Sequence, residues 1–168
     1  NRLCLLSPSV GKSLKAASAI VVSNRTTLAF LPAQYRDKCV VVSPNAVRDE
    51  DLEPLPPASR DVSETFEIVF AGACAATRAM PLVFEALASG IGTEWKMNLA
   101  GNGPALDFWK SEAERLGISD RVSFLGNIPR EELARIYARA SVLVFPALRD
   151  SGGSSILDAM TKGIPILA

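Results

Sequence analysis

The chain has 168 residues, of which 48% are hydrophobic and 21% are charged, a balance typical of a globular domain. Its 18 basic and 18 acidic residues cancel, so net charge favours neither nucleic acid nor an anionic membrane surface as the main partner. The longest apolar stretches, 16–22 and 141–147, are far shorter than the roughly 20 residues of a membrane-spanning helix. We therefore expect a cytoplasmic protein without a transmembrane segment. Peripheral association with the inner face of the membrane is kept open for the intact protein.

The chain contains no histidine, which excludes serine–histidine hydrolysis, histidine-based zinc sites and haem ligation within it. The three cysteines, Cys4, Cys39 and Cys74, are widely spaced and form no Cys-x-x-Cys pair. This spacing argues against a disulfide framework and against a zinc site. We expect a reducing compartment, and chemistry based on carboxylates, backbone amides and cations.

The first 43 residues predict a helix at 8–17, a strand at 19–22, a helix at 25–35 and a strand at 39–42, which together form an incomplete layer. Residues 44–65 are rich in proline and charge, a composition typical of a linker that builds no core. The chain begins at Asn1 without a methionine or a leader. We therefore expect a fragment of a longer protein, with a domain boundary at the linker.

From residue 66 onward, short apolar runs alternate with helix-period segments, the pattern of repeated βα units on a parallel sheet. The predicted strands are 66–71, 95–100, 121–125, 141–145 and 164–168, and the predicted helices are 80–89, 105–116, 130–140 and 154–162. Pro81 and Pro104 fit first-turn positions, and Gly90, Gly117 and Gly163 fit helix ends. The fold class is α/β, a Rossmann-like parallel sheet with helices on both faces. The last strand has no covering helix, so we expect the C-terminal end to be cut as well.

Open α/β sheets bind ligands beyond the carboxyl ends of their strands, so the loops after the strands are the candidate sites. After the first strand, Gly72 opens a run of small residues that leads to Arg78 near the start of a helix. Such a loop lets the backbone approach a phosphate while the arginine supplies a charged fork. The alternative is an ordinary turn with a surface arginine.

The next two loops carry weaker signals. Gly101 and Gly103 permit a tight turn that leaves the backbone open to a ligand, although many such turns are only structural. Asn127 and Ile128 lie in the turn after the third strand, just before a helix, where a turn with helix capping is the favoured explanation.

The loop after the fourth strand carries the strongest signal. It places Asp150 and Asp158 eight positions apart, one in the loop and one two turns into a helix. Between them, Gly152, Gly153 and Ser154 would present bare amides at a helix N-terminus, which favours an anion. Asp158 stands beside apolar residues and needs a specific partner, for which a ribose diol is suitable. The alternative is that Asp150 and Ser151 only cap the helix while Asp158 faces solvent.

Together these segments resemble the retaining GT-B glycosyltransferases often called group 1 transferases, or glycosyltransferase family 4. Five motifs carry the resemblance in order: 41–47, 69–72 with Arg78, 99–104, 121–126, and 150–160 with 163–165. The resemblance implies that residues 1–43 are a remnant of the N-terminal, acceptor-side domain. It implies that 44–65 is the interdomain linker and that 66–168 is the donor-binding C-terminal half of a GT-B fold, truncated at both ends.

The sequence departs from the family pattern at several positions. Both carboxylates of the paired motif are aspartates, where the family commonly has the longer glutamates. Ala73 stands where the family usually has an arginine, so diphosphate binding loses one expected cation. Arg78 replaces the usual lysine, and Ala79 replaces the glycine after it.

By this resemblance, the intact protein transfers a hexose from a nucleoside diphosphate sugar to an acceptor hydroxyl with retention of configuration. The acceptor would be a glycan, a lipid-linked sugar or a small molecule, and no metal or other cofactor is required. Arg78 and the amides of 152–154 would stabilise the departing diphosphate. Asp150 would contact the sugar hydroxyls and Asp158 the ribose, while the backbone at Asn127 and Ile128 would flank the base. Gly72, Gly101 and Gly103 complete the expected donor site, and the isolated fragment is expected to transfer little or nothing.

Two rival functions stay open. A nicotinamide-dependent dehydrogenase fits poorly, because residues 71–76 lack the three-glycine turn and no acidic residue ends the second strand. A catalytically inactive sugar-nucleotide-binding or scaffold module fits the loss of a cation at Ala73. Nucleotide binding separates these alternatives.

Overall fold

The computed structural model describes residues 7–42, 65–148 and 153–168. The chain divides into two compact units, Asn1–Ala46 and Val47–Ala168. Their boundary falls within the predicted linker, whose residues 44–64 lie outside the described part of the chain. Thr65, predicted as the last residue of the linker, is instead the first residue of a strand.

The first unit is a small α/β layer built on two parallel strands. Its elements in chain order are α2 (Pro8–Ala16), β1 (Ile20–Val22), α3 (Arg25–Phe30), α4 (Ala33–Arg36) and β2 (Cys39–Val41). Lys38 fixes the end of α2, because its Nζ donates hydrogen bonds to the carbonyl oxygens of Lys15 and Ala17 at 3.1 and 3.0 Å. Asn24 caps α3 by accepting a hydrogen bond from the Thr27 amide.

One predicted helix of this unit is wrong. The sequence predicts a single helix over 25–35, but the structure has α3 and α4, separated by an extended residue, Leu31, with φ −74° and ψ 144°. Pro32 explains the break, because proline pushes the preceding residue out of the helical region and has no amide hydrogen to donate.

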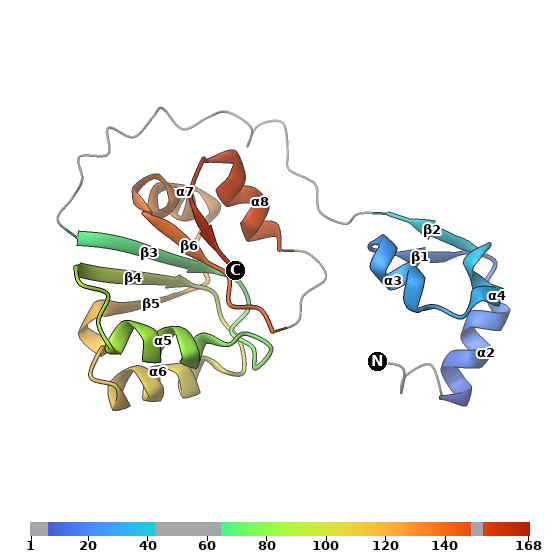
Figure 1. The fold of residues 1–168 in the computed structure, drawn as a ribbon, viewed down its shortest axis with the longest axis horizontal. Coiled ribbons are helices and arrows are strands. Elements are labelled where there is room, and N and C mark those ends of the chain that lie inside the picture. The colour runs from blue at the N-terminus through green and yellow to red at the C-terminus, as the bar shows by residue number, and fades with distance from the viewer. Residues whose placement is uncertain (1–6, 43–64, 149–152) are drawn as a thin grey trace. The chain divides into compact units, whose positions relative to one another are not determined.

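The second unit is a five-stranded parallel sheet in the order β5-β4-β3-β6-β7 (Figure 1). Its strands are β3 (Thr65–Ala71), β4 (Glu94–Ala100), β5 (Val122–Gly126), β6 (Val142–Val144) and β7 (Ile166–Leu167). The helices α5 (Met80–Ala88) and α6 (Leu106–Arg115) cover one face, and α7 (Arg130–Arg139) and α8 (Ser154–Thr161) cover the other. The predicted α/β fold with helices on both faces is confirmed.

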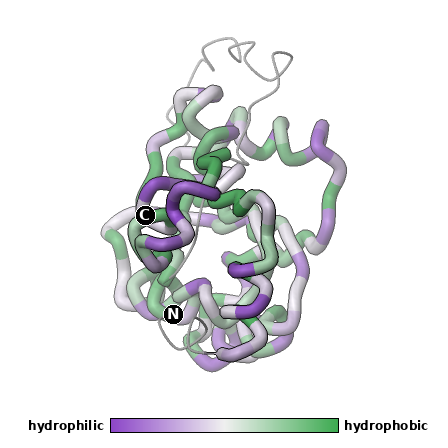
Figure 2. Tube along the Cα trace, turned by 90° about the vertical axis from the view of Figure 1, so that its right-hand side faces the viewer, coloured by the Kyte–Doolittle hydropathy of each residue, from purple (hydrophilic) through white to green (hydrophobic). Residues whose placement is uncertain are grey.

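The central strand β3 shows why both faces are covered. Its side chains alternate, so Ile68 and Phe70 pack against α5 and α6, while Val69 and Ala71 pack against α7 and α8. On the first face, Phe70 meets Trp109 of α6 edge to face, with ring centroids 5.7 Å apart. Hydrophobic and hydrophilic stretches accordingly alternate along the chain (Figure 2).

Several element ends differ from the prediction. Pro104 precedes the N-cap of α6, Ala105, and so does not lie in its first turn. Arg121 ends a short 3-10 helix, Ser119–Arg121, instead of starting β5. Pro81 lies in the first turn of α5 as predicted. The glycines that follow α5, α6 and α8 all have positive φ, as the prediction of glycine at helix ends requires: Gly90, Gly117 and Gly163.

Within the described ranges, no helix combines the length and the apolar character that crossing a membrane demands.

Candidate functional site

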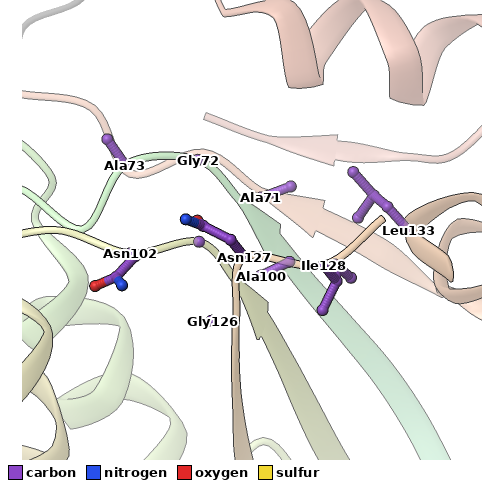
Figure 3. Close-up of a pocket in the computed structure, with 10 residues that line it drawn as sticks. Ala71, Gly72, Ala73, Ala100, Asn102, Gly126, Asn127, Ile128 and Leu133 are labelled. Atoms are coloured by element: carbon purple, nitrogen blue, oxygen red, sulfur yellow. The ribbon is translucent and has the colours of Figure 1, made fainter. Parts of the chain in front are cut away.

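A pocket of about 470 Å³ opens where the strands β3, β4 and β5 end (Figure 3). The ends of these strands and the loops that follow them supply most of its wall, and Leu133 of α7 supplies the rest. None of the lining residues carries a charge: Ala71, Gly72, Ala73, Ala100, Gly101, Asn102, Gly126, Asn127, Ile128 and Leu133. The pocket therefore lies at the sheet edge where α/β folds bind ligands, and its uncharged side chains suit an uncharged group better than an ion.

Four residues predicted as donor-binding line this pocket: Gly72, Gly101, Asn127 and Ile128. The structure thus brings together three loops that lie about 30 and 55 residues apart in the sequence. Sequence reasoning singled out neither Asn102 nor Gly126 as a ligand contact, although both belong to turns already recognised as candidates. Leu133 could not be found that way, because it belongs to α7 and reaches the pocket only once this helix packs on the sheet.

Backbone hydrogen bonds tie the first two loops together. The Gly72 amide donates to the Ala100 carbonyl at 3.0 Å, and the Cys74 amide donates to the Asn102 carbonyl at 3.0 Å. A Cβ on Gly101 would overlap the Gly72 carbonyl oxygen, and Gly101 has a φ of +142°. Glycine is therefore required here so that the two loops can approach each other.

Gly103, also predicted to bind the donor, is not among the lining residues of the pocket. A Cβ at this position would overlap the Cys74 carbonyl oxygen, which accepts a hydrogen bond from the Ala105 amide at 2.9 Å. The contact of Gly103 that the structure describes is therefore a structural one. It agrees with the second explanation of this turn, in which its glycines serve only the backbone geometry.

Asn127 brings a polar side chain to a largely apolar wall. Figure 3 shows its amide group directed toward the Gly72 loop. The other asparagine, Asn102, uses its Oδ1 to accept a hydrogen bond from the Gly103 amide at 2.7 Å. Among the described residues, the Asn127 side chain makes no hydrogen bond, so its donor and acceptor are available to a ligand.

Arg78 lies in the loop before α5, held by the segment that follows β6. Its backbone forms an antiparallel bridge with Ala147, and the neighbouring Ala79 amide donates to the Pro146 carbonyl at 2.7 Å. The guanidinium carbon lies 4.5 Å from the centroid of the Phe145 ring, and the Nη1 nitrogen is buried. Arg78 therefore has a defined position and is not an ordinary surface arginine.

The start of α8 carries two of the predicted anion-binding residues, Gly153 and Ser154. Gly153 is the N-cap and has no side chain of its own that could accept a hydrogen bond from the first amides of the helix. A Cβ on Gly153 would overlap the Phe145 ring, so the same ring touches both Arg78 and the start of α8. Asp150 and Gly152 lie outside the described residues, and their predicted roles stay predictions.

Asp158, predicted to hold a ribose, is partly buried on α8 with 32% of its side chain exposed. Arg130, the first residue of α7, brings its Nη2 to 3.8 Å from the Asp158 Oδ1. In the sequence, only apolar residues stand beside Asp158. Its charged neighbour Arg130 could not be predicted, because Arg130 lies on a different helix. Burial, and secondarily the negative charge of Asp158, raise the pKa of the nearby buried Tyr137.

Across the described ranges, no three histidine, cysteine, aspartate or glutamate side chains gather in a way that could hold a metal ion.

Comparison with known sequences identifies a protein family for this chain. The sequence profile of the family described as glycosyl transferases group 1 matches residues 53–168. The 2-deoxystreptamine glucosyltransferase of Streptomyces kanamyceticus is 24% identical over 93% of this chain and 43% of its own length. The D-inositol 3-phosphate glycosyltransferase of Mycolicibacterium smegmatis is 28% identical over 79% of this chain and 32% of its own length. The chain thus spans less than half the length of these relatives.

Solved structures share the fold. A glycosyltransferase from Rickettsia africae matches 96% of this chain and 48% of its own, with a TM-score of 0.75 and 14% identity. The Anabaena protein HepE, solved in complex with UDP and glucose, matches 94% of this chain and 46% of its own, with a TM-score of 0.71 and 17% identity. The expected GT-B architecture is confirmed by these likenesses.

Proposed function

Since this chain belongs to the glycosyl transferases group 1 family, we propose that it is the donor-binding part of a retaining hexosyltransferase. In the intact protein, the bond between the anomeric carbon of the donor sugar and the diphosphate breaks. A bond from the same carbon to the acceptor oxygen forms, and the proton of the acceptor hydroxyl passes to the departing diphosphate. The nucleoside diphosphate is the leaving group.

The observation that carries this proposal is the uncharged pocket between the β3, β4 and β5 loops, with a cation and a helix N-terminus in the same unit. The nucleobase lies against Asn127 and Ile128 in the pocket. Asp158 accepts hydrogen bonds from the ribose hydroxyls, since a carboxylate can accept two at once. Arg78 and the amides at 152–154 hold the diphosphate and stabilise the charge that grows on it as it departs. Asp150 contacts the hydroxyls of the donor sugar.

Relatives and neighbours support the substrate classes. HepE is described in complex with UDP and glucose, and the two relatives above are named for glycosyl transfer to 2-deoxystreptamine and to D-inositol 3-phosphate. For the intact protein we propose a nucleoside diphosphate sugar as donor, and a glycan, a lipid-linked sugar or a small molecule as acceptor.

Calorimetric titration of the chain with UDP, GDP, ADP and NAD tests the donor-binding role. We expect one nucleoside diphosphate to bind, and to bind more weakly to an Asp158→Ala variant. Arg135→Ala is the matched control, because Arg135 is an exposed charge on the adjacent helix α7. Preference for NAD would favour a dehydrogenase, and binding of none of the four would contradict the proposal.

A second candidate, an inactive sugar-nucleotide-binding module, is favoured by Ala73, which lines the pocket where a cation would assist the diphosphate. Assays of the intact protein decide between them, because the inactive module binds the donor but neither transfers its sugar to an acceptor nor releases the nucleoside diphosphate. We further propose that transfer needs no metal. Activity that is lost in EDTA and restored by a divalent cation would disprove this part.

A further inference from the structure

We infer that Phe145 is a positioning residue for the donor diphosphate, because its ring holds the Arg78 guanidinium next to the start of α8. The inference rests on the proposed function and adds to it a residue that touches neither the sugar nor the nucleotide. Phe145 directly follows β6 and is 6% exposed.

The first contact of the ring is with the cation. The Arg78 guanidinium carbon lies 4.5 Å from the ring centroid, within the range of a cation–π interaction. A guanidinium is flat and weakly hydrated, so it stacks on an aromatic face better than the compact ammonium of lysine does. The pair therefore gives a physical reason for an arginine at position 78 and limits the rotamers that its long side chain can adopt.

The second contact of the ring is with the helix. Gly153 is the N-cap of α8, and a Cβ there would overlap the Phe145 ring atoms. Only glycine allows the ring to lie this close to the helix start. One buried side chain thus contacts both groups that the proposed function assigns to the diphosphate.

The backbone keeps this arrangement in register. The Ala79 amide donates to the Pro146 carbonyl at 2.7 Å, and the Leu148 amide donates to the Thr77 carbonyl at 3.0 Å. The segments on either side of Arg78 and just after Phe145 are therefore joined directly. Replacement of the ring would leave these backbone hydrogen bonds in place and remove the aromatic face on which the guanidinium lies.

The test first identifies which of UDP, GDP and ADP binds most tightly to the wild type. It then compares, in each variant, the affinity for this diphosphate with the affinity for the corresponding monophosphate. Only the diphosphate has the second phosphate, so the ratio of the two affinities reports on the phosphate-binding groups and not on general stability. We expect the ratio to fall roughly five-fold in Phe145→Leu, because the guanidinium loses its cation–π contact and with it part of its fixed orientation. Phe145→Met is the second variant if the leucine variant does not fold.

Two further variants sharpen the test. Phe124→Leu removes a partly buried ring that packs against Phe84 on the other side of the sheet, and it should leave the ratio unchanged. In an Arg78→Ala background, Phe145→Leu should lower the ratio no further, because the ring acts through the cation.

An unchanged ratio in the Phe145 variants, or full additivity with Arg78→Ala, would overturn the inference. If the wild-type chain binds none of the three diphosphates, the proposed function itself fails. If the wild type prefers the diphosphate and Phe145→Leu keeps that preference, only the role of Phe145 is refuted.

Discussion

Arg130 and Asp158 come from different helices, yet the Nη2 of Arg130 lies 3.8 Å from the Oδ1 of Asp158. Arg130 is the first residue of α7, where the helix dipole disfavours a cation. The carboxylate of Asp158 on α8 offsets this effect with a favourable charge from another helix. The distance is longer than a hydrogen bond, so this contact is an ion pair in which neither atom is hydrogen-bonded to the other.

Asp158→Asn should weaken nucleotide binding and reduce the preference for a ribonucleotide over its 2′-deoxy analogue. The amide keeps the size of the side chain but has one acceptor oxygen instead of two, so we expect a loss of roughly ten-fold in affinity for the ribonucleotide. The free energy of unfolding should change by less than about 1 kcal/mol, because the ion pair is long and its side chains are 51% and 32% exposed. Titration with UDP and 2′-deoxy-UDP, or with the matching pair of the preferred base, measures the effect. Unaltered discrimination would remove Asp158 from the ribose site.

Gly103→Ala should destabilise the second unit by roughly 3 kcal/mol, through positive φ and overlap with the Cys74 carbonyl. Gly117→Ala is the control, because Gly117 also has positive φ but a Cβ there meets nothing within 4 Å. The Gly117→Ala variant should lose only about 1 kcal/mol of unfolding free energy. Urea unfolding followed by tryptophan fluorescence reports on this unit, since both tryptophans, Trp95 and Trp109, are buried in it. Equal losses in the two variants would show that the loop contact contributes little.

Ala73→Arg should strengthen diphosphate binding roughly five-fold. The position lines the pocket and is exposed, so the new cation can reach a phosphate without burial. The gain should shrink as salt is raised, because salt screens exposed charges. Ala76→Arg adds the same charge at an exposed position of the same loop that does not line the pocket, and it should have a smaller effect. A gain of the same size from Ala76→Arg would indicate general attraction instead of a specific contact.

Cys74 should react with iodoacetamide much more slowly than Cys39 does in the folded protein. Burial raises the pKa of the Cys74 thiol, so less of it is thiolate at pH 8, and the side chain is also fully buried. Cys39 is only partly buried. Peptide mass spectrometry after timed alkylation measures both rates, and denaturation in guanidinium should make them similar. Rapid labelling of Cys74 in the folded state would contradict its burial.

The sequence by itself determined the class of fold and most of the second unit. Apolar runs such as the one in β3 are long enough to identify buried parallel strands, and glycines after helices identify their ends, because both signals are local. The predicted ends of helices were less accurate. Pro32 divided a predicted helix, and Pro104 stood one residue before the N-cap of its helix.

The tertiary structure decided which residues meet. The sequence could identify Gly101 and Gly103 as unusual, but only the packing of the neighbouring loops shows that one lines the pocket and the other accommodates the Cys74 carbonyl. The ring of Phe145 between β6 and α8, and the Arg130 side chain near Asp158, were likewise beyond sequence reasoning. Such contacts join residues that lie far apart along the chain, so no local pattern encodes them. They arise only when the helices pack on the two faces of the sheet.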